Sequence, residues 1–195
     1  MCRQVCRIWL TADLRSVSEV SRIMGGLEFE IAAFLEPRQM KYGSIKAVKQ
    51  MDPTCCWAAS LEWWIRARQT LGSYTQVDIL GLYAHLYEKN EASSEYGTVN
   101  KAAMFKILGD VRWGMSTRWI MGHQFTDDEA GIMLAKGPMI VGYFEPDAGG
   151  NHVVVMYEFS GSSNMKVMDP NSGRHRTWKR SKFRNQKELV LGYLR

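Results

Sequence analysis

Apolar side chains recur at helical spacing through the middle of the chain and at strand-like spacing near its end. Residues 56–71 place large apolar side chains three or four positions apart, which predicts a helix with one buried face that Gly72 ends. Shorter patterns of the same kind predict helices over residues 75–89 and 99–108. A capping-box sequence predicts one more helix over residues 126–136.

After Pro138 the chain changes to short runs rich in Val, Ile, Tyr and Phe, separated by clusters of turn residues. These runs predict strands over residues 139–144, 152–159, 165–168 and 189–194. The turn spacing favours an antiparallel sheet in which the second and third runs form a hairpin. Helices followed by strands indicate an α+β fold, with two layers around one core.

The first 44 residues carry a weaker pattern than the rest of the chain. Residues 17–24 and 29–35 have the composition of short helices or strands, and Gly and Pro residues interrupt them. A chain of 195 residues fits one ordinary domain. We therefore predict an N-terminal segment of open role over residues 1–44 and one domain over residues 45–195.

Composition narrows the class of protein further. Apolar residues make up 46% and charged residues 23%, as is normal for a globular protein. No stretch approaches the roughly 18 apolar residues of a membrane span. The N-terminus lacks the continuous apolar core and small-residue cleavage site of a signal peptide. The sequence thus predicts neither a membrane span nor a cleaved leader.

Neither the cysteines nor the charged residues of the sequence point to a bound cofactor. Cys55 and Cys56 are adjacent, which is a poor geometry for a disulfide, and Cys2 and Cys6 have no nearby residues that would complete a zinc site. We interpret Cys2, Cys6 and Cys55 as reduced thiols without a role. Much of the net charge of +5 lies in a basic run over residues 174–187. Without a nucleic-acid-binding motif, this run is more typical of a solvated face, although an acidic partner is compatible with it.

Candidate chemistry begins where a cysteine opens the first predicted helix. The free amides and the positive dipole end of a helix stabilise an anion, so a thiol at this position loses its proton more readily. Cys56, directly followed by Trp57, is therefore the candidate nucleophile. Gln50 lies just upstream, where a turn would fold its amide back to stabilise the oxyanion that forms when a thiolate attacks a peptide bond.

Two further residues fall at the ends of neighbouring predicted strands. His152 begins one strand after a glycine turn, and Asp169 ends the next. If the two strands pair, the carboxylate can hold one ring nitrogen of the histidine and turn the other towards the thiol. Asn171 is an alternative for this orienting role.

These residues together resemble the papain-like cysteine peptidases. The resemblance rests on Gln50, the Cys56–Ser60 segment, His152 with the valines after it, and Asp169-Pro170. It is strongest to the bacterial branch, which includes peptidase domains of bacteriocin-processing transporters and avirulence-type peptidase effectors. It implies a papain-like fold with N-terminal helices packed on a C-terminal antiparallel sheet.

The resemblance also implies roles for individual residues. Cys56 would be the nucleophile, His152 the general base and acid, Asp169 the orienting residue and Gln50 the oxyanion donor, with no metal or cofactor. The Asp-Pro-Thr-Cys sequence before the nucleophile departs from the Cys-Gly-Ser of lysosomal relatives, so their disulfide and substrate pockets do not carry over. The remaining histidines match no motif position, and we interpret them as structural or surface residues: His85, His123 and His175.

The implied function is that of a cysteine protease that cleaves a protein target through a thioester intermediate. The bacterial motifs further suggest a secreted effector or antibacterial toxin, made in the bacterial cytoplasm, delivered into a target cell and accompanied by an immunity or chaperone protein. Two alternatives stay open. The same site could deamidate a protein target or transfer acyl groups to it, or the chain could be a non-enzymatic module whose basic face contacts nucleic acid.

Overall fold

The computed structural model describes residues 42–87, 97–148 and 150–195. The helices or strands predicted over residues 17–24 and 29–35 lie outside these ranges, as does most of the predicted N-terminal segment. The described residues begin with a short 3-10 turn, η1 (Tyr42–Ser44). The Tyr42 ring packs against that of Tyr157, with ring centroids 6.3 Å apart, so the described chain is anchored to the domain from its first residue.

The helical first half contains the three predicted helices, which are α2 (Cys56–Arg68), α3 (Gln76–Leu82) and α4 (Lys101–Leu108). Helix α2 ends one turn earlier than predicted, because Gln69 takes a left-handed conformation at its C-terminal cap. Helix α3 is much shorter than the predicted 75–89. Its apolar pattern continues past Leu82, but Tyr83 and Tyr87 there pack their rings against Trp57 from turns rather than from a helix.

The second half forms a six-stranded antiparallel sheet in the order β1-β6-β2-β3-β4-β5. Its strands are β1 (Met115–Ile120), β2 (Met139–Glu145), β3 (Gly150–Ser160), β4 (Asn164–Asp169), β5 (Arg174–Lys179) and β6 (Leu189–Leu194). All four predicted strands are confirmed. The predicted hairpin is confirmed as well, because β3 pairs with β4 in a register that places Val155 opposite Met168.

Both edge strands, β1 and β5, were missed by the sequence analysis. They lack the apolar alternation that marks a half-buried strand, since most of their side chains are exposed or only partly buried. Strand β5 carries the first part of the basic run. Charged side chains on an edge strand discourage pairing with another chain, which gives this part of the run a structural role.

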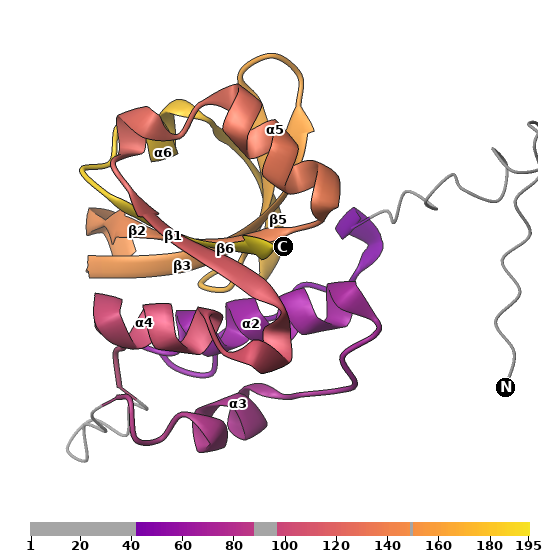
Figure 1. The fold of residues 1–195 in the computed structure, drawn as a ribbon, viewed down its shortest axis with the longest axis vertical. Helices are drawn as coiled ribbons and strands as arrows, with labels where there is room; N and C mark the ends of the chain where they lie inside the picture. The colour runs from indigo at the N-terminus through magenta and orange to yellow at the C-terminus, as the bar shows by residue number, and fades with distance from the viewer. Residues whose placement is uncertain (1–41, 88–96, 149) are drawn as a thin grey trace, which may run out of the picture. The chain divides into compact units, whose positions relative to one another are not determined.

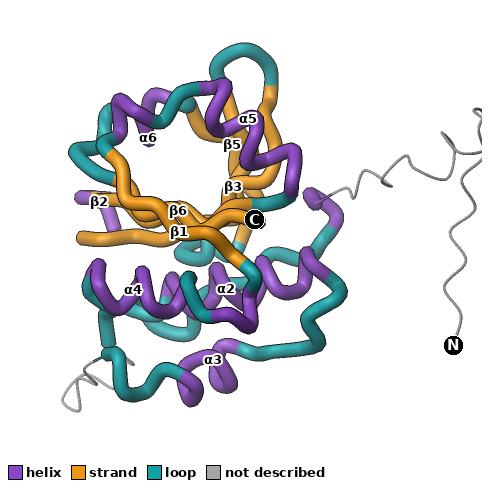
Figure 2. The backbone as a smooth tube through the Cα atoms, in the orientation of Figure 1, coloured by secondary structure: helices purple, strands orange, loops and turns teal. Residues whose placement is uncertain are grey.

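The sheet is covered on both faces, so the expectation of two layers was wrong. Figure 1 shows α2 and α4 on one face of the sheet, with α5 (Asp127–Lys136) and α6 (Ser181–Arg184) on the other. The tube in Figure 2 shows α3 beyond α2, farther from the sheet. Two apolar clusters result. One joins α2 and α4 to Val153 and Val155, and the other lies beneath α5 and includes Val154 and Met156.

The reason for the second cluster is visible in β3. Residues 152–157 are all buried, whereas a strand with one solvent-exposed face would alternate between buried and exposed positions. Three further 3-10 turns complete the described chain, namely η2 (Val111–Trp113), η3 (Gly122–Gln124) and η4 (Pro146–Ala148). Of the helices described, none has the length and apolar character needed to cross a membrane.

Candidate active site

Cys56 is the first residue of α2, at the end of the helix that faces β3. A turn leads into it, in which the Asp52 carboxylate accepts hydrogen bonds from the Thr54 amide at 2.7 Å and the Thr54 hydroxyl at 2.6 Å. The Cys55 amide donates to the Asp52 carbonyl at 3.4 Å. This local network starts the helix at Cys56, as the sequence predicted, and the residue is 6% exposed.

Two opposing effects act on the thiol of Cys56. Burial raises the pKa of this thiol to about 12, while hydrogen bonds from backbone groups of Val153 and of the first residues of α2 lower it. These backbone donors are the free amides expected at a helix start, joined by one from β3. At neutral pH the thiol therefore keeps its proton unless a nearby base takes it.

His152 and Asp169 form a buried pair. The ring nitrogen Nε2 of His152 lies 3.0 Å from Oδ1 of Asp169, and the two residues are 4% and 7% exposed. An ionised carboxylate can only accept, so Nε2 carries the hydrogen. In the neutral ring, Nδ1 is then the unprotonated nitrogen, free to take a proton from another group.

Three donors hold the Asp169 carboxylate. Besides His152, the Asn171 amide donates to Oδ1 at 3.1 Å and the Ser172 hydroxyl donates to Oδ2 at 2.8 Å. Burial raises the pKa of Asp169, but these hydrogen bonds outweigh it and hold the pKa below its usual value. Of the two residues considered for the orienting role, the structure places Asp169 on the histidine, and Asn171 contributes its backbone to the aspartate.

Tyr143 backs the histidine ring. It lies directly opposite His152 in the β2–β3 register, and the two rings meet edge to face with centroids 5.9 Å apart. The Tyr143 hydroxyl donates to Glu145 at 3.1 Å, and Glu145 is ion-paired with Lys182. The tyrosine is almost fully buried, so it shields one side of the His152–Asp169 pair from water.

The Cys56 thiol lies beside the strand that carries His152. The backbone of Val153, the residue after His152, lies close enough to the Cys56 thiol to lower its pKa. Among the described residues, no hydrogen bond joins that thiol to the His152 ring. The structure therefore brings Cys56 to the strand that carries His152, and proton transfer requires the thiol and the free ring nitrogen to come within hydrogen-bond reach.

Gln50 lies on the loop that connects η1 to α2, beside the end of β4. Its backbone amide donates to the carbonyl of Pro170 at 2.9 Å, next to Asp169. Its side-chain Oε1 is buried with no hydrogen-bond partner among the described residues. A buried amide oxygen without a partner is unusual, which marks this side chain as one that local packing alone does not explain.

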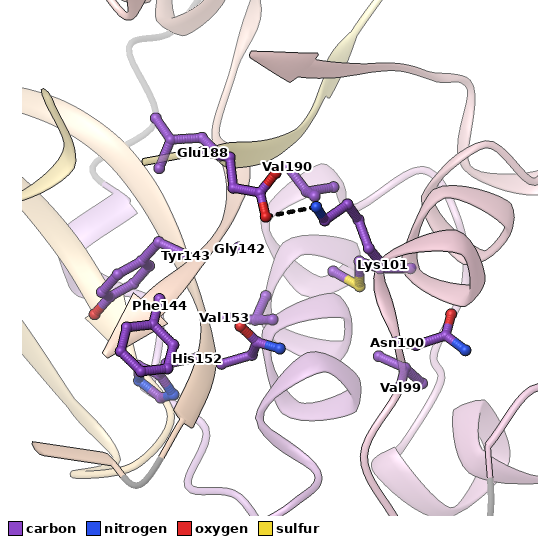
Figure 3. Close-up of a pocket in the computed structure, with 13 residues that line it drawn as sticks. Val99, Asn100, Lys101, Gly142, Tyr143, Phe144, His152, Val153, Glu188 and Val190 are labelled. Carbon is purple, nitrogen blue, oxygen red and sulfur yellow. Dashed lines mark ion pairs between the residues drawn. The ribbon is translucent and has the colours of Figure 1, made fainter. Parts of the chain in front are cut away.

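A pocket opens beside His152, between the start of α4 and the sheet (Figure 3). Its floor follows a row of residues paired across the strands, in which Val153 lies opposite Gly142 and Gly142 lies opposite Val190. At its rim, Lys101 and Glu188 form an ion pair at 2.5 Å. The lining is mainly apolar, with polar groups at the rim and at the histidine.

Residues outside the site have identifiable structural roles. His175 donates through Nε2 to the Ile45 carbonyl at 2.8 Å and packs against the Trp63 and Tyr157 rings, while His85 and His123 are exposed. The end of the basic run is paired within the chain. Asp127 forms ion pairs with Arg180 and Arg184. Among the described residues, no group of three His, Cys, Asp or Glu side chains could hold a metal ion.

Two polar residues that support the site were not predicted from the sequence. Ser172 bonds the Asp169 carboxylate, and its position in a turn after Asp-Pro was the available signal. Gln76, the first residue of α3, bonds to backbone groups on both sides of Gln50. No pattern in the sequence pointed to it, because its partners lie 25 and 27 positions away.

Comparison with known proteins supports the fold. Neither a protein-family model nor a curated protein matches the sequence. Among solved structures, the peptidase domain of Streptococcus ComA, a bi-functional ABC transporter involved in a quorum-sensing pathway, is 18% identical. The match covers 77% of this chain and 99% of that domain, with a TM-score of 0.54. The peptidase domain of Streptococcus mutans ComA is 15% identical over 75% of this chain and 98% of that one, with a TM-score of 0.42.

The first of these likenesses shows that the chain has the α+β, papain-like fold predicted from its sequence. The first neighbour is the peptidase domain of an ABC transporter, and peptidase domains of transporters are one of the two groups that the sequence resembled. The resemblance to avirulence-type effectors stays a prediction.

Proposed function

We propose that this chain is a cysteine peptidase in which Cys56 is the nucleophile, His152 the general base and acid, Asp169 the orienting residue and Gln50 the oxyanion donor. The observation that most supports this proposal is the buried His152–Asp169 pair. The strand that carries His152 also contacts Cys56 at the start of a helix. A hydrogen-bonded histidine beside a helix-terminal thiol is the arrangement needed to activate a sulfur nucleophile.

The reaction follows from the state of each group. As Cys56 Sγ attacks a peptide carbonyl carbon, Nδ1 of His152 takes the thiol proton, and the imidazolium is stabilised by Asp169. Collapse of the oxyanion breaks the C–N bond, and the amine leaves with the proton from His152. Water then attacks the thioester while His152 takes its proton, which releases the carboxylic acid and regenerates the thiol. The Gln50 amide would donate to the oxyanion in both halves of the reaction.

The pocket beside His152 favours an apolar substrate side chain next to the scissile bond. Val153 joins the two features, because it lines the pocket while its backbone lies beside the Cys56 thiol and lowers the pKa of that thiol. A peptide placed across Cys56 therefore extends over Gly142 and Val190 towards the Lys101–Glu188 pair at the rim.

The test of this proposal is a comparison of the wild type with Cys56→Ala, each produced in bacterial cells, by sequencing new chain termini across the proteome. Cys55→Ala is the matched control, because Cys55 is the neighbouring buried cysteine and its thiol contacts Asp52 and Gln76 and does not act as the nucleophile. We expect discrete new termini with the wild type and Cys55→Ala, and none with Cys56→Ala. Identical profiles for wild type and Cys56→Ala would refute a peptidase that acts in these cells.

Deamidation or acyl transfer by the same site would change the mass of the target protein in a different way from peptide cleavage. Deamidation of a glutamine changes the target mass by about one mass unit without cutting the chain, and acyl transfer adds the mass of the acyl group. Intact-mass spectra of modified proteins from the same cells therefore separate these reactions from peptide cleavage. Salt-sensitive retention of nucleic acid that survives Cys56→Ala would favour the binding-module alternative.

We further propose a delivered effector or antibacterial toxin, with an immunity or chaperone protein as its partner. This role is supported by the sequence resemblance alone. Its test is growth of the producing cells. We expect the wild type, but not Cys56→Ala, to slow growth, and growth to recover when the partner is produced in the same cells. Equal growth with both proteins would direct the search to a target outside bacteria.

A further inference from the structure

Gln76 holds the loop that carries Gln50 from both sides. Its Oε1 accepts a hydrogen bond from the Met51 amide at 3.1 Å, and its Nε2 donates to the Lys49 carbonyl at 3.0 Å. Its Oε1 is also 3.6 Å from the thiol of Cys55, the residue before the candidate nucleophile. One side chain thus links the residues before and after Gln50 to the start of α2.

Gln76 is itself held in place. It is 8% exposed, and its backbone amide donates to Glu62 on α2 at 2.9 Å. Glu62 is 4% exposed and is ion-paired with Arg66 one turn further along the same helix. The chain of contacts therefore runs from the body of α2 through Glu62 and Gln76 to the Gln50 loop, and it fixes that loop relative to the helix that carries Cys56.

The loop has a second anchor among the described residues. On its other side, the Gln50 amide bonds the Pro170 carbonyl, which ties the loop to the end of β4. The Oε1 atom of the Gln50 side chain is buried and has no hydrogen-bond partner in the described residues. Gln76 and Pro170 hold the backbone that carries this side chain.

We infer that Gln76 is a positioning residue that aims the Gln50 amide at the oxyanion formed on Cys56. This inference rests on the proposed function and deepens it. Gln76 does not touch the reacting atoms, because both ends of its side-chain amide are engaged by Lys49, Met51 and Cys55. Its effect passes through Gln50, so it belongs to the acylation step and not to the reactivity of the thiol as such.

Two reagents distinguish an effect on the acylation step from an effect on the reactivity of the Cys56 thiol. Acylation of Cys56 by p-nitrophenyl acetate passes through a tetrahedral oxyanion, whereas alkylation by iodoacetamide displaces iodide and forms no oxyanion. The variant is Gln76→Met, which keeps the length and unbranched shape of the side chain but removes both hydrogen bonds that its amide group makes to the loop. We expect its acylation rate to fall at least about ten-fold, since losing an oxyanion donor outright costs about 100- to 1,000-fold. The alkylation rate should stay within about two-fold of the wild type.

The dependence on Gln50 is tested by a double-mutant cycle. If Gln76 acts through Gln50, Gln76→Met lowers acylation in the wild type but adds no further loss in a Gln50→Ala background. Thr75→Ala is the control, because it removes the N-terminal cap of α3 at the neighbouring residue without touching the Gln50 loop. Its acylation rate should match that of the wild type.

The outcomes separate the inference from the function on which it rests. A wild type that shows no Cys56-dependent acylation overturns both. Normal Cys56-dependent acylation with an unchanged Gln76→Met rate overturns the positioning role alone. A parallel loss of acylation and alkylation, or an equal loss in the Gln50→Ala background, also overturns it, because Gln76 would then act on the thiol or on folding in general.

Discussion

At the scale of single residues, the site depends on where protons are held. Asp169 receives hydrogen bonds from His152, Asn171 and Ser172, and these bonds keep its carboxylate ionised in a buried place. The ionised carboxylate in turn selects the His152 tautomer whose free nitrogen can act as a base. One aspartate therefore determines both the charge and the direction of the histidine.

Replacing Asp169 with Asn tests this at the level of stability. The pKa of Asp169 is lowered in the folded protein, so its charge stabilises the fold above the unfolded pKa and this stabilisation is lost as the pH falls through the folded value. We expect Asp169→Asn to lower the free energy of unfolding by about 1–3 kcal/mol at pH 7. The difference from the wild type should shrink below about pH 4, where the unfolded carboxyl is protonated.

Denaturant unfolding at pH 7 and at successively lower pH measures this difference. Asn171→Ala is a suitable control, because Asn171 bonds the aspartate through its backbone amide, which the substitution keeps. A gap between wild type and Asp169→Asn that is the same at every pH would contradict a stabilising charge at this position.

At the scale of elements, the two helix caps on opposite faces of the sheet have different relations to the site. Asn100 caps α4 by accepting from the Ala103 amide at 2.9 Å, and Thr126 caps α5 by accepting from the Glu129 amide at 3.2 Å. Only the start of α4 lines the pocket beside His152. The packing of α5 lies on the other face, in the second apolar cluster.

A matched pair of cap substitutions follows from this difference. Asn100→Ala and Thr126→Ala should each destabilise the protein by about 1 kcal/mol, the usual effect of losing a cap. For a peptide substrate identified from the cleaved proteome, we expect Asn100→Ala to raise KM and Thr126→Ala to leave it unchanged. Thermal unfolding and steady-state kinetics measure the two effects. An equal change in KM for both variants would mean that α4 has no special relation to the substrate.

At the scale of the whole molecule, the pocket lies where a helical layer and the sheet meet beside the site. Its floor is formed by Val153, Gly142 and Val190 on three strands, and its wall by the start of α4. A side chain on Gly142 would meet Val190 and Val153 at ordinary contact distances, so the position accepts alanine without strain. Such a change narrows the pocket and leaves the candidate catalytic residues in place.

Gly142→Ala is therefore expected to change which peptides are cut. Substrates with a large apolar side chain at the pocket position should lose about ten-fold in kcat/KM, whereas substrates with a small residue there should be cut at the wild-type rate. Cleavage of a peptide library derived from a digested proteome, read by mass spectrometry, measures this preference. An unchanged preference would show that the pocket does not receive a substrate side chain.

Much of this molecule could be predicted from local sequence patterns. Helix α2 with Cys56 at its start, the β3–β4 hairpin and the α+β class all depend on neighbouring residues or on short turns, which a sequence reader can see. The pairing of His152 with Asp169 followed from that hairpin. The edge strands could not be found in this way, because their exposed side chains leave no apolar period.

What only the tertiary structure decided are the contacts between residues distant in the chain. The second helical layer could be predicted only by knowing that β3 is buried on both faces. The link from Gln76 to the Gln50 loop joins positions 25 and 27 residues apart, and the bond from Gln50 to Pro170 joins the loop before α2 to the turn after β4. Periodicity and propensity depend on near neighbours, whereas such polar contacts form only when packing brings separate elements together. The sequence alone therefore determined which residues were candidates for chemistry, and the fold decided which polar groups hold them in place.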